Sequence, residues 1–294
     1  MIIQRQLTFL SGGLALLALL ACGRAGVDKP EEPTDEDAIY NIIRYDRPAE
    51  FNIDLLDFTV PDTTLMLAGQ LQPLFYWRNL QKDSLFIDIQ ISVPEPGDTL
   101  GSVPWADVAV TKFFYGTFEI IALDTTGGGS QRVRLSKNLT VRGDILAVFE
   151  KVGFDYNTRR GWILSRISDA AYDGHGPQIR ALTFHSSTRP DQVFTPVLSP
   201  RPMAAIAEFN PGDSIVLTLS IVNPANYVSV RYPAASGFAT RPLEATGPGD
   251  YTGGFRLPVK VGFDRFLIDV LKSESVNDTL PYQSTSISVI YRAR

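Results

Sequence analysis

Apolar and polar residues alternate through residues 83–93, with the sequence DSLFIDIQISV. The apolar positions are the odd ones: Leu85, Ile87, Ile89, Ile91 and Val93. Because side chains of a β-strand point alternately to its two faces, this spacing predicts a strand with one buried and one solvated face. The same period returns at 213–222 and 227–233, so the chain is predicted to be mainly β.

The first predicted domain, 38–172, begins with a helix and continues as strands. Three isoleucines at helical spacing and acidic residues in the first turn predict a short helix over 36–46. Residues 49–58 fit either a second short helix or an extended segment. Further strands are predicted over 105–123, 131–141, 143–154 and 159–168, the first of these as one long strand or two joined strands.

A helix or two followed by a long, curved antiparallel meander resembles the nuclear-transport-factor-like cone of the SnoaL-like superfamily. The residues that carry the likeness close the meander: Phe149, Lys151, Gly161, Trp162 and Ile167. The resemblance implies an α+β cone over this domain. A β-sandwich or a lipocalin-like barrel is the alternative.

Cone folds of this kind often hold a pocket, lined by aromatic side chains and a few polar groups. The candidates for its lining are Trp77, Arg78, Asp88, Trp105, Glu150 and Trp162. The alternative reading places the aromatic residues in the core and the charged residues on solvated strand faces. Enzymes of the superfamily use an Asp–His pair, but His175 and His185 both lie outside this domain. We therefore assign no catalytic residue and predict that the protein is not an enzyme.

The second predicted domain, 178–294, follows the hinge-like stretch DGHGP at 173–177. Short alternating strands recur between turn clusters, as is typical of a β-sandwich. The predicted strands are 178–187, 213–222, 227–233, 249–259, 264–272 and 284–292. The region resembles a bacterial immunoglobulin-like domain, although it lacks the cysteines and tryptophan of antibody domains. Such modules act as spacers or adhesive surfaces.

The N-terminal residues 1–21 are predicted to be a secretory signal peptide, with Arg5 preceding an apolar stretch too short to span a bilayer. The segment ends in Leu19-Leu20-Ala21-Cys22, which resembles the lipobox of bacterial lipoproteins. The resemblance implies cleavage between Ala21 and Cys22 and lipidation of the only cysteine by diacylglycerol and an N-acyl chain such as palmitate. Residues 22–37, acidic and proline-containing, are predicted to form a disordered tether.

The composition narrows the choice of partners. Lys and Arg number 27 against 32 Asp and Glu, which argues against nucleic acid. One cysteine and two histidines leave little for a metal site, and no cofactor is predicted beyond the lipid on Cys22. We expect an envelope lipoprotein that binds, adheres or scaffolds, with the membrane and envelope proteins or glycans as partners. Gly23 in place of aspartate favours the outer membrane over the inner membrane. The alternative is an enzyme or a small-ligand-binding protein with its pocket in the first domain.

Overall fold

The computed structural model describes residues 34–55, 60–61, 71–94, 103–124, 131–194, 198–222 and 226–294. The protein is mainly β in these ranges, and nearly all of its strands pair antiparallel. The predicted signal peptide, the predicted cleavage site after Ala21 and the predicted lipidation site Cys22 lie outside the described residues.

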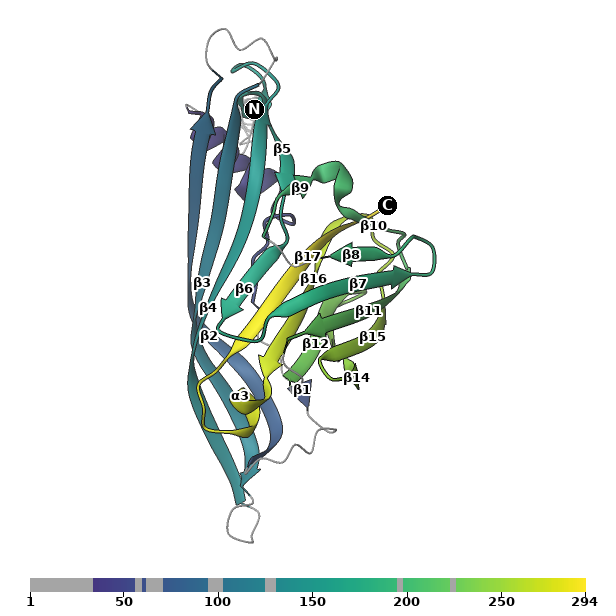
Figure 1. The fold of residues 1–294 in the computed structure, drawn as a ribbon. Coiled ribbons are helices and arrows are strands. Elements are labelled where there is room, and N and C mark those ends of the chain that lie inside the picture. Colours follow the sequence, from purple (N-terminus) through teal and green to yellow (C-terminus); the bar gives the residue numbers. More distant parts are fainter. Residues whose placement is uncertain are drawn as a thin grey trace, which may run out of the picture.

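Three long strands form the largest part of the fold and run the length of the molecule (Figure 1). They are β2 (Leu71–Ser92), β3 (Trp105–Asp124) and β4 (Gln131–Lys151). β4 joins two segments predicted as separate strands, because its ladder with β3 continues through Gly143 opposite Lys112. β2 begins at Leu71, well before the predicted start, and crosses two irregularities in its ladder near Pro73 and Leu80.

The long strands belong to a sheet of twelve strands, counted over the described residues. In spatial order its main path is β1 (Val60–Pro61), β2, β3, β4, β6 (Ala170–Gly174), β17 (Ser284–Ala293), β16 (Gly262–Lys272), β12 (Asn226–Ala234) and β13 (Gly237–Pro242). Three short strands attach beside this path: β5 (Trp162–Ile167), β9 (Arg201–Pro202) and β10 (Ala207–Phe209). Strands of both predicted domains therefore share one sheet.

The predicted hinge at 173–177 lies along this shared sheet. Asp173 and Gly174 are in β6 and pair with β17, and the amide of Gly176 donates to the carbonyl of Ser284 at 3.1 Å. β6 also pairs with β4 through Asp173. Backbone hydrogen bonds to β17 therefore hold residues 173–176 along the sheet, and the hinge between two domains stays a prediction.

A second sheet covers one face of the C-terminal strands of the first (Figure 1). Its order is β14 (Glu244–Gly247), β15 (Asp250–Arg256), β11 (Ser214–Ile221), β7 (Ile179–Ser186) and β8 (Gln192–Phe194). Phe184 of β7 meets Phe266 of β16 at a ring distance of 5.1 Å, and Phe266 stacks on Tyr291 of β17 at 4.2 Å. The two sheets thus pack face to face around an aromatic core. Short helical turns η3 (Met203–Ala205) and α3 (Ser273–Asn277) connect strands of this half.

The N-terminal segment fills the concave side of the long strands. α2 (Asp35–Asn41) starts where Thr34 accepts a hydrogen bond from the amide of Asp37 at 3.1 Å, and it continues as the π-helical turn η1 (Ile42–Asp46). The helix begins at Asp35, within the stretch predicted as the tether. Residues 52–55 follow without helical structure, so in this part the extended alternative for 49–58 is the correct one.

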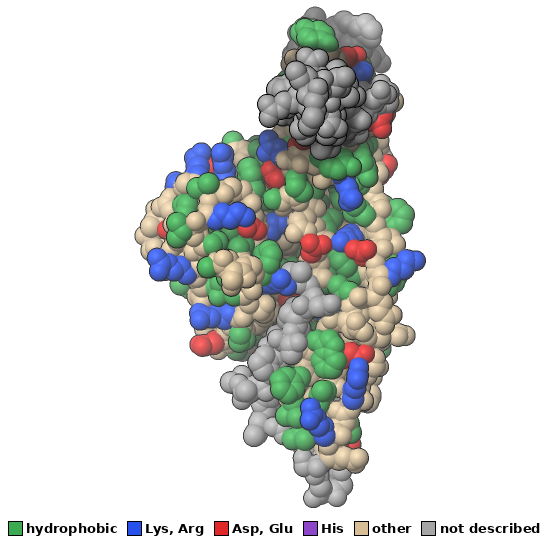
Figure 2. Space-filling model, turned by 180° about the vertical axis from the view of Figure 1, so that it is seen from behind, with side chains coloured by type: hydrophobic (Ala, Val, Ile, Leu, Met, Phe, Trp, Pro, Cys, Tyr) green, Lys and Arg blue, Asp and Glu red, His purple; other side chains and the backbone are tan. Residues whose placement is uncertain are grey.

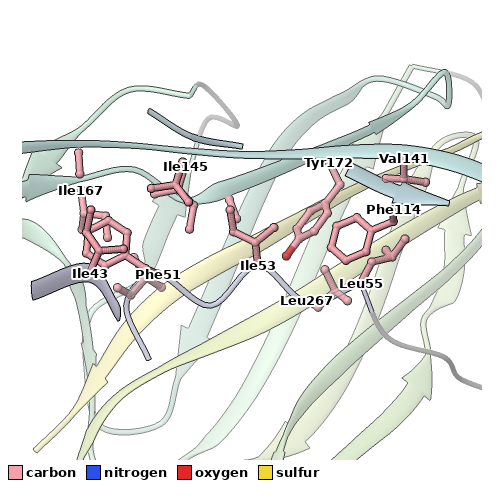
Figure 3. Close-up of a cluster of buried hydrophobic side chains, with 14 of the residues drawn as sticks. Ile43, Phe51, Ile53, Leu55, Phe114, Val141, Ile145, Ile167, Tyr172 and Leu267 are labelled. Atoms are coloured by element: carbon pink, nitrogen blue, oxygen red, sulfur yellow. The ribbon is translucent and has the colours of Figure 1, made fainter. Parts of the chain in front are cut away.

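The core of this half is made from the N-terminal segment and the inner face of the strands. Ile43, Phe51, Ile53 and Leu55 point toward Ile145, Ile167, Tyr172 and Phe114, as Figure 3 shows. Burial of each large apolar side chain contributes about 1.5–3 kcal/mol, so this segment stabilises the curvature of the sheet.

Candidate functional site

The six residues predicted to line a pocket do not meet in one cavity. Arg78 is buried and ion-paired with Asp269 of β16, whereas Asp88 is exposed ten positions further along β2, about 30 Å away in an extended strand. Trp77 is partly exposed, with the Arg134 guanidinium 5.7 Å from its ring centre. These three candidates therefore occupy separate surroundings.

The other three candidates lie near one another at the end of the sheet beside α2. Trp105 and Glu150 are partners in the β3–β4 ladder, and Trp162 pairs with Lys151 on the far side of β4. Trp162 is buried, while Trp105 is exposed. Three of the six predicted residues therefore lie near one another, but no cavity described here is lined by them.

Three neighbouring cavities lie between the N-terminal segment and the strands around it, and all three are lined by Asp54. The first, of about 430 Å³, lies against Ile43, Leu85 and Lys112. The second, of about 440 Å³, adds Lys82, Phe114 and Arg231. The third, of about 220 Å³, reaches Arg231, Lys260, Asp264 and Arg265. We call this set the Asp54 groove.

The charge of Lys112, which lines both of the first two cavities, is paired. The Lys112 ammonium lies 3.2 Å from the carboxylate of Asp54 and 2.8 Å from that of Asp83. Burial alone would lower the pKa of Lys112, but the two carboxylates raise it above its usual value. Lys112 is therefore a fixed cation between two anions.

The third cavity differs, because its guanidinium groups have no carboxylate in contact. Arg231 of β12 is half-buried, and its Nε has no hydrogen-bond partner among the described residues. Its guanidinium lies 4.6 Å from the ring centre of Phe238. Burial lowers the pKa of Arg231, and the charge of Asp54 only partly opposes this.

Arg265 of β16 is buried, with 7% of its surface exposed. It donates to the backbone carbonyls of Ser288, at 2.8 Å, and of Glu50, while its Nε has no partner in the described part of the chain. Burial lowers the pKa of Arg265 to about 10. The arginine is thus satisfied mainly by neutral groups.

Two carboxylates whose charges act on Arg265 are bound to other cations. Asp169 forms a two-pronged pair with Arg201 at 2.7 and 2.8 Å, and Glu50 pairs with Arg47 at 2.9 Å. Asp264 also lines the cavity, and burial raises the pKa of its carboxyl group. Lys260 adds an exposed cation that makes no ion pair among the described residues. The cavity therefore has an excess of cationic groups.

Arg231, Arg265 and Asp54 are not among the residues predicted from the sequence. One signal was available in β16, whose even positions face the aromatic core between the sheets and whose odd positions Leu267 and Leu271 face the other core. Arg265 and Asp269 fall among these odd positions. A strand that is apolar on both faces except for two charged residues indicates buried polar interactions.

A second surface feature lies at the end of the molecule where the described chain begins. Phe154 and Tyr156 in the loop after β4 stack at 5.3 Å while 67% and 84% exposed. Three further exposed side chains, Val152, Ile163 and Trp105, belong to the same strand ends. We call these five residues the apolar end.

Ion pairs tie α2 and η1 to the loop of the apolar end, which includes the helical turn η2 (Thr158–Gly161). Asp35 pairs with Lys151 and Arg160, at 3.0 and 2.7 Å, and Asp46 pairs with Arg159 at 2.7 Å. Burial would raise the pKa of Asp35, but hydrogen bonds from Arg160 and Lys151 hold it below its usual value. The start of α2 is therefore fixed beside the apolar end.

The described residues form neither a metal site nor a membrane-spanning helix. Within the described ranges, no three His, Cys, Asp or Glu side chains gather as a metal site requires. No helix in the described part of the chain is long and apolar enough to cross a membrane. Comparison with protein-family models, curated proteins and solved structures finds no match.

Basic and acidic side chains are interspersed over the face seen in Figure 2.

Proposed function

We propose that the chain is a membrane-anchored lipoprotein of the bacterial envelope with a non-catalytic binding role. The observation that carries the binding role is the Asp54 groove, in which three cavities adjoin between the N-terminal segment and the strands around it. Cavities of this size accommodate part of a small molecule or an extended glycan or peptide. Envelope proteins or glycans are the proposed partners.

The proposed anchor is Cys22, carrying diacylglycerol and an N-acyl chain, with no other cofactor. Two or more acyl chains hold a protein stably on a bilayer. Residues 22–33 reach at most about 40 Å when extended, and the described chain begins beside the apolar end. We place the apolar end against the lipid surface of the outer membrane.

The proposed fold assignments follow from the two cores. The face-to-face sheets around Phe184 and Phe266 support an immunoglobulin-like module in the C-terminal half. The curved strands β2–β4, with α2 and residues 47–55 on their concave side, support a cone-like N-terminal half. A module of the first kind is a suitable spacer or adhesive surface beside the groove.

The anchor is tested with Cys22→Ser in cells. We expect the variant to lose labelled palmitate and to leave the membrane fraction, because the acylated thiol is absent. Unchanged palmitate labelling in this variant contradicts the lipoprotein proposal.

The binding role is tested by filling the groove. Leu85 lines the first cavity and is partly exposed, so Leu85→Trp occupies that cavity without removing a charge. The mature Cys22→Ser chain is titrated with envelope glycans and proteins, and Leu85→Trp is expected to weaken the interaction at least fivefold. Leu280→Trp, a similarly exposed leucine outside the groove, is the matched control. Equal binding by all three chains contradicts a role for the groove.

A further inference from the structure

The third cavity of the Asp54 groove contains cations in excess of the carboxylates that contact them. We infer that this cavity binds an oxyanion, a carboxylate or a phosphate, at the end of a larger polar ligand, with Arg231, Arg265 and Lys260 as its cationic partners. The inference rests on the proposed binding role of the groove and names the chemistry of its ligand.

The guanidinium groups of the two arginines in this cavity have no contacting carboxylate in the described part of the chain. A guanidinium taken out of water is normally compensated by a carboxylate, since desolvation without a partner costs several kcal/mol. Here Arg231 and Arg265 line one cavity, and neither has a contacting carboxylate among the described residues. Each has a buried Nε–H without an acceptor in that part of the chain. An incoming oxyanion would supply the missing charge.

Three carboxylates around the cavity are bound to cations that do not line it. Asp169 and Glu50, whose charges act on Arg265, are bound by Arg201 and Arg47. Asp54 lies 3.2 Å from Lys112. Asp264 is the carboxylate that remains in the cavity, where the charges of Lys260 and Arg265 act on it, and burial raises the pKa of its carboxyl group. Apart from Asp264, the fold therefore directs these carboxylates to other cations.

The size of this cavity also favours an oxyanion at the end of a ligand. The cavity of about 220 Å³ is smaller than the roughly 300–1,000 Å³ of sites that enclose a whole drug-sized ligand. It therefore suits a terminal charged group. Arg231 also lines the second cavity, of about 440 Å³, which provides space for the rest of the ligand. Phe238, partly exposed and stacked with Arg231, offers an aromatic face to a sugar ring at the rim.

The inference is tested by calorimetric titration of the mature Cys22→Ser chain. The probes are glycerol 3-phosphate, trigalacturonate and the neutral galactotriose, which separate a lipid headgroup, an acidic glycan and an uncharged glycan. We expect one of the two anionic probes to bind at least tenfold more tightly than galactotriose. The tighter anionic probe identifies the source of the oxyanion.

The variants assign the binding to this cavity. Arg231→Met is expected to weaken the anionic probe at least tenfold, and Lys260→Met about threefold. Arg180→Met removes an exposed charge from β7, outside the cavity, and is expected to change affinity less than twofold. In the absence of ligand, Arg231→Met should unfold at a melting temperature no lower than the parent, because it removes a desolvated cation with no ion-pair partner.

Two results overturn the inference. One is equal affinity of the parent and Arg231→Met chains for the anionic probe. The other is that galactotriose binds as tightly as the anionic probes, or that none of the three binds. If Leu85→Trp still weakens an envelope interaction in that event, the binding role stands and only the oxyanion chemistry fails.

Discussion

Arg78 of β2 donates two hydrogen bonds to the carboxylate of Asp269 in β16, at 2.7 and 2.9 Å, across 191 positions of sequence. Tyr282 accepts a third hydrogen bond from Arg78 at 2.7 Å, and Ser286 donates to Asp269 at 2.6 Å. All four side chains are buried. This network connects the long-stranded half to the C-terminal half through side chains, in addition to the shared sheet.

Breaking this pair is expected to be costly. Arg78→Met leaves the charge of Asp269 buried without its partner, and losses of this kind amount to about 3–5 kcal/mol. The measurement is the free energy of unfolding in urea. Arg142→Met, which removes an exposed partner of the partly exposed Asp144, is the control and should cost less than about 1 kcal/mol. A loss below about 1 kcal/mol for Arg78→Met would show that the network adds little.

Lys137 of β4 predicts a specific dependence of stability on pH. Its ammonium donates to the carbonyls of Ser275 and Asp278, both at 2.6 Å, and burial lowers its pKa from 10.5 to about 8. Between these values the unfolded chain binds more protons than the folded chain, so the free energy of unfolding rises with pH.

The test compares the parent with Lys137→Met, which has no group to titrate at this position. The parent should gain stability relative to the variant between about pH 8 and pH 10, and the exposed Lys82→Met variant should follow the parent. The difference cancels the buried tyrosines common to all three chains, whose raised pKa values act in the opposite direction. A pH-independent difference would be inconsistent with a lowered pKa of Lys137.

Gly161, at the end of η2, should not tolerate a side chain. Its φ is +77°, and a Cβ there would lie 2.4–2.6 Å from backbone atoms of Gly153. Gly161→Ala therefore combines an unfavourable backbone conformation with a steric clash and is expected to cost more than about 2 kcal/mol. Gly237→Ala, at φ +108° but with open space around it, is the control for backbone conformation alone. Urea unfolding of both variants decides whether the close approach of the two glycines matters.

The apolar end gives a prediction about the membrane surface. Phe154 and Tyr156 should partition into the interfacial region of a bilayer, where aromatic side chains are favoured. The mature Cys22→Ser chain should co-sediment weakly with vesicles of phosphatidylethanolamine and phosphatidylglycerol. The double variant Phe154→Ser/Tyr156→Ser should reduce this binding at least threefold. Phe238→Ser, exposed on β13, should leave it unchanged. Equal co-sedimentation of all three chains would argue against the proposed orientation.

Much of the secondary structure was predictable because apolar and polar residues alternate locally along the strands. The strands β7, β11, β12, β15, β16 and β17 all overlap the predicted segments, and β3 is a single strand over almost the predicted range. The first half of β2 was missed, since Pro73 and the unbroken run of apolar and aromatic residues over 74–77 give no alternation. The segments 131–141 and 143–154 were predicted as separate strands, whereas β4 continues through Gly143, where a Cβ would lie 2.7 Å from Ile53 and 3.0 Å from Tyr172.

The candidate site was not predictable to the same degree. Arg231, Arg265 and Asp54 come from three separate segments, and only the long-range pairing of β12 with β16 and the path of residues 47–55 bring them together. The pairing of β6 with β17 could not be predicted either, because it also joins segments far apart in the sequence. Its residues read locally as a turn, and the partner strand lies more than 100 positions away.

The ladder between β6 and β17 determines where the chain can be divided. A fragment beginning at residue 178 would lack β6 and leave the edge of β17 open beside a buried face. Open edges with apolar faces template strand addition and aggregation. A C-terminal fragment that keeps this edge of β17 covered therefore begins no later than Ala170.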